Sequence, residues 1–136
     1  MRIPQQPSIF KKGFTLLEMT LVILMLLIMI KTGFLVSSKM DEWKLGRDAG
    51  ETLRTVYSAQ RMYLADNPTV AVNAITSAVI IPYLPNNAAT IPTVKSLAKT
   101  QLSILVNVSP PVINAGSGVT YDPSGSNKDS LWDVGE

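Results

Sequence analysis

An apolar run that contains one carboxylate places the strongest constraint on this chain. Residues 14–36 consist mainly of Leu, Ile, Met and Val, and the acid among them is Glu18. At about 1.5 Å per residue, residues 14–30 form a helix of about 25 Å, and a snorkelling Lys31 completes the crossing of a bilayer about 30 Å thick. A carboxylate inside such a helix costs about 2.5–3.5 kcal/mol on insertion scales, so Glu18 is expected to have a function and a partner.

Basic residues and a glycine precede the apolar run. Lys11 and Lys12 are followed directly by Gly13 and Phe14, and the two lysines are expected to stay on the cytoplasmic side. A secretory signal would have an apolar core of about 7–15 residues and then a small-residue cleavage site, which is missing here. An uncleaved signal anchor explains the charge and the hydrophobicity, although it explains neither the glycine before Phe14 nor the acid.

The sequence from Lys11 to Glu18, Lys-Lys-Gly-Phe-Thr-Leu-Leu-Glu, resembles the processing motif of type IV prepilins and type II secretion pseudopilins. The resemblance covers residues 11–36, and the two lysines match the basic end of the family's leader. It implies that a prepilin peptidase cuts after Gly13, that Phe14 becomes an N-methylated terminus, and that Glu18 guides filament assembly. It also implies an inner-membrane assembly platform and other pilin or pseudopilin subunits as partners.

The chain accordingly divides into a leader, residues 1–13, a transmembrane and filament-core helix, residues 14–36, and residues 37–136. In this last part, apolar residues recur at helical spacing to Leu64, so the helix is expected to continue as an amphipathic helix to about Ala65. Asp66-Asn67-Pro68 should end it. Gly46 and Gly50 mark either a close packing contact, a bend or harmless exposed positions.

The remaining 70 or so residues are close to the lower limit for an independent core, so the head is expected to pack on the amphipathic half of the helix. The fold class is therefore α+β and pilin-like, with a short helix and a small antiparallel sheet in the head. The expected elements are a helix through Val70–Ile80 capped by Asn67 or Thr69, a helical turn in 92–99, and strands at 102–108, 112–113, 119–121 and 131–134.

Composition excludes several classes of site. The net charge of +2 depends on Arg2, Lys11 and Lys12 in the leader, and the remaining nine basic and ten acidic residues give no support for nucleic-acid binding. The chain has no cysteine and no histidine, which excludes disulfides, thiolate or imidazole zinc sites and catalytic dyads that need either residue.

One oxygen-rich cluster near the C-terminus leaves two interpretations open. Asp122, Asp129 and Asp133, with Ser124 and Asn127, could ligate calcium, and major pseudopilins carry calcium in a C-terminal loop of this kind. The same residue types are also common turn formers, and their spacing does not match an EF-hand. No other cofactor is expected.

These features lead to two functional hypotheses. The first is a non-enzymatic structural subunit of a type II secretion pseudopilus or a type IV pilus-like filament, anchored once in the bacterial inner membrane with its head in the periplasm. The alternative is a periplasmic binding or enzymatic domain on an uncleaved anchor. The first is favoured, because the unusual chemistry lies in the anchor.

We expect the chain to be cut between Gly13 and Phe14, leaving residues 14–136 as the mature protein. Gly13→Val should block processing, because a branched side chain would crowd a subsite that accepts only hydrogen. N-terminal sequencing of protein from cells that contain prepilin peptidase checks the cut. A terminus at Met1 in those cells would contradict it.

Overall fold

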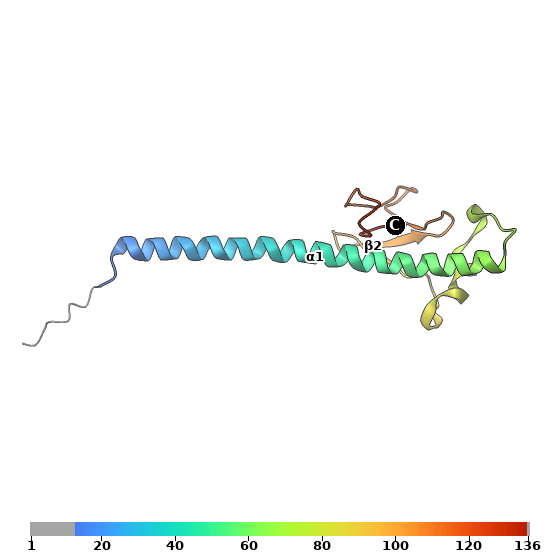
Figure 1. Cartoon of the computed structure of the whole chain (residues 1–136), viewed down its shortest axis with the longest axis horizontal. Coiled ribbons are helices and arrows are strands. Elements are labelled where there is room, and N and C mark those ends of the chain that lie inside the picture. Colours follow the sequence, from blue (N-terminus) through green and yellow to red (C-terminus); the bar gives the residue numbers. More distant parts are fainter. Residues whose placement is uncertain (1–12, 136) are drawn as a thin grey trace, which may run out of the picture. The chain divides into compact units, whose positions relative to one another are not determined.

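The computed structural model describes residues 13–135. Residues 13–38 and residues 39–135 belong to two different compact units. In chain order the elements are α1 (Leu16–Asp66), η1 (Val72–Ala74), α2 (Ser77–Ile80), η2 (Ile81–Tyr83), η3 (Pro85–Asn87), β1 (Val94–Lys95), β2 (Gln101–Leu105) and β3 (Val112–Asn114) (Figure 1). The η elements are single turns of 3-10 helix. A long apolar helix followed by a small antiparallel sheet confirms the expected α+β layout.

The apolar part of α1, in the first unit, satisfies its few hydroxyl groups internally. Thr20 Oγ1 donates to the Leu17 carbonyl at 2.8 Å, and Thr32 Oγ1 donates to the Ile28 carbonyl at 2.8 Å. Such bonds to the preceding turn let threonine lie in a helix without an unpaired polar group. These bonds leave both threonine hydroxyls paired within the helix, as an apolar environment would require.

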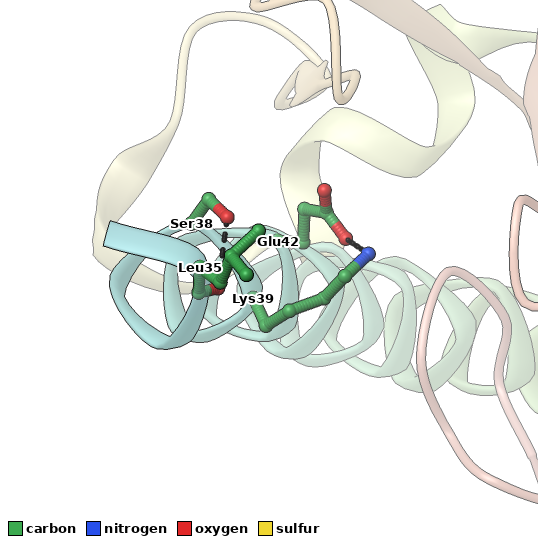
Figure 2. Close-up of polar contacts among 4 residues, drawn as sticks. All are labelled: Leu35, Ser38, Lys39 and Glu42. Atoms are coloured by element: carbon green, nitrogen blue, oxygen red, sulfur yellow. Dashed lines mark hydrogen bonds and ion pairs between the residues drawn. The ribbon is translucent and has the colours of Figure 1, made fainter. Parts of the chain in front are cut away.

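Polar side chains enter α1 where its apolar part ends. Ser38 Oγ donates to the Leu35 carbonyl at 3.0 Å, and Lys39 Nζ donates to Glu42 Oε2 at 2.9 Å (Figure 2). Both partners of the ion pair are exposed, so its contribution is small, about 0.3–0.5 kcal/mol. From these contacts onward, the side chains of α1 are suited to water, whereas the preceding ones are suited to hydrocarbon.

The second part of α1 is amphipathic and supplies one side of the head's core. Its buried positions recur every three or four residues, as one helix face requires. They are Gly46, Ala49, Gly50, Leu53, Val56, Ala59 and Gln60. Head residues that pack with this face are Ile75, Ile80, Leu84, Val94, Ile104, Val106, Ile113 and Trp132. The expectation that the head packs on the amphipathic helix is therefore confirmed.

The segment after α1 differs from the sequence prediction. α1 ends at Asp66, as Pro68 predicted, but the single helix expected through Val70–Ile80 is wrong. Only η1 and the four-residue α2 form there, and neither has a side-chain cap. β-branched residues are frequent in this stretch and lower its helix propensity, and so short a helix is marginal without tertiary packing. α2 ends before Pro82, as expected, and Pro82 lies in the following turn η2, because proline is tolerated in a first turn.

Three short antiparallel strands form a sheet in the order β1-β2-β3. Val94 pairs with Leu102 and Ile104 pairs with Ile113. Figure 1 shows β2 beside the green part of α1, where the shared core lies. The helical turn expected in 92–99 is wrong, because β1 forms there. The strand expected at 119–121 is reduced to one bridge, between Asn114 and Thr120.

The strand predicted at 102–108 ends at Leu105, because a side chain of α1 donates hydrogen bonds to carbonyl groups beyond that residue. Gln60 Nε2 donates to the carbonyls of Val106 and Val108 at 2.8 and 2.7 Å. Gln60 is fully buried. A buried amide that bridges backbone carbonyls replaces the ladder partners that these groups would otherwise need.

The strand expected at 131–134 is also wrong, since this segment packs on α1 as a loop. The backbone N–H of Trp132 donates to the Gly46 carbonyl at 3.3 Å, and a Cβ at position 46 would lie 2.8 Å from Trp132 Nε1. A Cβ at position 50 would meet the Ser130 carbonyl oxygen. Trp132 and Ser130 have φ angles of 67° and 59°, which an extended strand does not allow. Gly46 and Gly50 therefore mark a close packing contact, one of the alternatives left open by the sequence.

We expect Gly50→Ala to lower the free energy of unfolding by about 1–3 kcal/mol, because backbone rather than a flexible side chain would have to move. This cost should outweigh the better helix propensity of alanine, about 1 kcal/mol. Ser58→Ala, on the exposed face of α1, should change stability by less than about 0.5 kcal/mol. Denaturant unfolding of the full chain in detergent measures both. Unchanged stability of Gly50→Ala would show that the loop does not need this contact.

Candidate functional site

The candidate processing site lies in exposed backbone before α1. Gly13 and Phe14 are outside the helix, and Phe14 is 76% exposed. The helix was expected to begin at Phe14 but begins at Leu16. The Gly13–Phe14 bond thus lies outside the helix. Lys11 and Lys12 lie outside the described residues, and the cleavage and methylation of Phe14 stay predictions.

Thr15 explains where the helix starts, and its role was not foreseen. Its Oγ1 accepts a hydrogen bond from the Glu18 backbone N–H at 3.2 Å, as an N-cap residue does. Thr15 and Glu18 have the spacing of a capping box, Thr-x-x-Glu, which is readable from the sequence. Glu18 lies in the first turn, where the helix dipole favours a negative charge. The carboxylate therefore has a structural use before any partner arrives.

The side chains of α1 that follow Glu18 form an unpartnered apolar surface. In the span that could cross a membrane, the most apolar window has a mean hydropathy of 2.4 and is 0% buried. Its exposed large side chains include Leu21, Ile23, Leu27 and Ile30, each more than half exposed. One helix in the described chain is long and apolar enough to cross a membrane, which agrees with a single-pass protein.

The acidic residues near the C-terminus organise a loop around Ser124. Asp122 Oδ1 accepts from the Ser124 hydroxyl at 2.6 Å and from its backbone N–H at 3.0 Å. Asp129 Oδ1 accepts from the Leu131 N–H at 3.0 Å and lies 3.5 Å from Ser124 Oγ. These are the bonds of Asx turns, so turn formation accounts for both acids. Nothing in the sequence beyond its residue type indicated that Ser124 would lie at the centre of these hydrogen bonds.

The donor set around Ser124 has the chemistry that calcium prefers. Its Oγ lies within 3.5 Å of Asp122 Oδ1, Asp129 Oδ1 and the carbonyls of Ser126 and Leu131. Calcium takes six to eight oxygens from such groups. In residues 13–135, however, no three acidic, histidine or cysteine side chains gather as a metal site. Hydroxyl and carbonyl oxygens would have to complete the shell, and calcium remains a prediction.

Asp133 differs from the other two acids because it faces the protein. Among the described residues, neither oxygen of its carboxylate makes a well-formed hydrogen bond, although the Gly135 backbone is close enough to lower its pKa, and both oxygens are inaccessible to solvent. Burial raises the pKa of this carboxyl above its ordinary value, and the charges of Asp122 and Asp129 act in the same direction. Arg54 and the Gly135 backbone oppose the increase without reversing it. The structure thus does not group Asp133 with the other acids as an equivalent ligand.

No protein-family model, curated protein or solved structure matches this chain. The absence of catalysis therefore stays a prediction, as does the assignment to the pilin-like family.

The raised pKa of Asp133 makes the head's stability depend on pH. The folded state holds the proton more tightly than the unfolded state, so stability falls as pH rises above the ordinary aspartate pKa of about 3.9 and through the raised value. Asp133→Asn should remove this decline and raise the melting temperature at neutral pH.

Melting temperatures measured from about pH 3 to about pH 7 test this prediction, because the range includes the ordinary aspartate pKa of about 3.9 and the pH values above it. Asp41→Asn is the matched control, because this acid is exposed on α1 and the variant should keep the wild-type slope. Parallel plots of melting temperature against pH for Asp133→Asn and the unchanged chain would contradict the prediction. They would show that the folded protein stabilises the charged carboxylate of Asp133 after all.

Proposed function

We propose that this chain is a structural subunit of a pilus-like or pseudopilus-like filament, processed at Gly13 and assembled by packing of the apolar part of α1. The observation that carries the proposal is an exposed apolar helix surface with a carboxylate in its first turn. A lipid bilayer can cover the apolar side chains. It does not provide a partner for Glu18, whereas a second subunit does.

The partner that suits Glu18 is a cation on another copy. Cleavage after Gly13 would create an amine at Phe14, and this amine would be positive at neutral pH. Phe14 precedes the capped first turn of α1, so the helix does not hold the amine of the same chain at a fixed position relative to Glu18. An amine from a subunit already in the filament can meet the exposed carboxylate and fix the axial stagger.

In this proposal the leader lysines stay on the cytoplasmic side and the head, residues 39–135, lies in the periplasm. The head's core contains apolar packing and one buried glutamine bridge, both suited to a rigid body carried by a helix. Prepilin peptidase and an inner-membrane assembly platform are the expected partners, as the resemblance of residues 11–36 implies. The filament could serve secretion or adhesion equally well.

A second candidate is a membrane-anchored periplasmic domain that is never cleaved. The place of Glu18 in the first turn of α1 favours it, because the helix dipole accounts for an acid there in the uncut chain. Conservative substitutions distinguish the two roles. Glu18→Gln keeps the Thr-x-x-Gln spacing of a capping box and removes the charge. Thr15→Val removes the N-cap hydrogen bond and leaves the charge of Glu18.

We expect Glu18→Gln to permit insertion and cleavage while lowering the yield of sheared filaments at least tenfold. Glu18→Ala should behave alike, and Thr15→Val should retain most filaments. Immunoblots measure insertion and cleavage, and electron microscopy measures filaments. Wild-type filament yield from Glu18→Gln would show that the charge of Glu18 does not guide assembly.

A further inference from the structure

Two opposite charges share the apolar part of α1 and have no partner on their own helix. Between residues 13 and 38, Glu18 and Lys31 are the charged residues. Both are exposed, and the ion pairs found in the described part of the chain, Lys39–Glu42 and Arg47–Glu51, involve neither. Each charge therefore needs water, a lipid headgroup or another molecule.

The spacing of the two charges prevents a pair within one helix and suits a pair between two. Thirteen residues separate Glu18 from Lys31, which corresponds to about 20 Å along the axis and about 140° around it. The two side chains thus lie on nearly opposite faces. When two copies lie parallel and displaced by about 20 Å, Glu18 of one reaches the level of Lys31 of the other.

Opposite faces make this contact repeatable. Each copy would use its Glu18 face toward one neighbour and its Lys31 face toward the next, a head-to-tail contact that continues indefinitely when its rotation does not close into a ring. Such a contact builds filaments rather than dimers. Charge complementarity also fixes the register, because apolar surfaces alone slide with little change in energy.

We propose that Glu18 of one copy forms an ion pair with Lys31 of a second copy, with the two helices parallel and displaced by about 20 Å. The inference rests on the proposed filament function and names the partner surface for it. In a membrane, Lys31 can extend to the headgroups; in a packed filament that route is closed, and an unpaired buried ammonium is costly.

The pair is compatible with the proposed contact between Glu18 and the Phe14 amine. An ionised carboxylate has two oxygens and accepts bonds from several donors. The two contacts require different displacements, since Phe14 precedes Glu18 by four residues and Lys31 follows it by thirteen. They therefore belong to different neighbours in one helical array, and Glu18 connects both.

Cysteine cross-linking tests the register directly, because the chain has no cysteine of its own. Val22 lies one turn after Glu18 and Leu35 one turn after Lys31, each on the same face as its charge and exposed. Filaments assembled from a mixture of Val22→Cys and Leu35→Cys full-length chains should form a disulfide-linked heterodimer on oxidation. The double variant should form a ladder.

Leu24→Cys is the matched control, because Leu24 lies on the Lys31 face, seven residues before it, and is similarly exposed. Paired with Val22→Cys, it should give no heterodimer. Lys31→Gln in the Leu35→Cys chain should lower the cross-linked fraction of assembled protein at least fivefold, and Lys31→Arg should restore it, if the ion pair sets the register.

Filaments in normal amount without the 22–35 product would overturn the inference and leave the filament function standing. An unchanged cross-linked fraction in Lys31→Gln would overturn the ion pair, and Lys31 would then serve only to reach lipid headgroups. Failure of the unmodified chain to form any filament would overturn the proposed function and the inference with it.

Discussion

Burial of the face of α1 that contains Ala49, Leu53 and Val56 is the interaction on which the rest of the head depends. Helices and strands in residues 67–135 are too short to provide a core alone, and the sheet has strands of two to five residues. Two or three short strands are marginal without an apolar surface to pack on. α1 provides that surface, so loops, turns and strands are arranged according to what they can cover on it.

Backbone polar groups impose the second constraint, and side chains of α1 meet part of it. Gln60 reaches across the core to the carbonyls beyond β2, and its Oε1 has no partner within the described residues. The Gly46 carbonyl accepts a bond from the C-terminal loop. One helix thus acts as a hydrophobic support and as a hydrogen-bond partner for segments that lack regular pairing.

Local signals predicted the elements that local forces determine. The long helix followed from its periodicity, its end from Pro68, and β3 from an apolar pair before a turn. The segment 131–134 was misassigned because its conformation depends on two glycines more than 80 residues earlier, a relation that no local pattern contains. The helix expected after Pro68 failed because β-branched residues weakened it and tertiary packing favoured separate turns.

For the candidate site, the residue types were readable and their grouping was not. Asp122, Asp129 and Asp133 look equivalent in the sequence, yet two accept turn hydrogen bonds and the third has carboxylate oxygens that are inaccessible to solvent and make no well-formed hydrogen bond. Burial depends on the whole fold, so spacing could not separate them. The N-cap at Thr15 could have been predicted from the Thr-x-x-Glu spacing. The same residues also belong to the processing motif, which was the interpretation chosen.

The order in which the chain is synthesised gives the Gly46–Gly50 contact a further meaning. α1 leaves the ribosome before the segment that covers these glycines, which includes Ser130 and Trp132 and lies 80 or more residues later in the chain. Domains complete their folding only when their last contacts are available. The face of α1 around Gly46 and Gly50 therefore stays uncovered until that segment has been synthesised, so this part of the head is completed late.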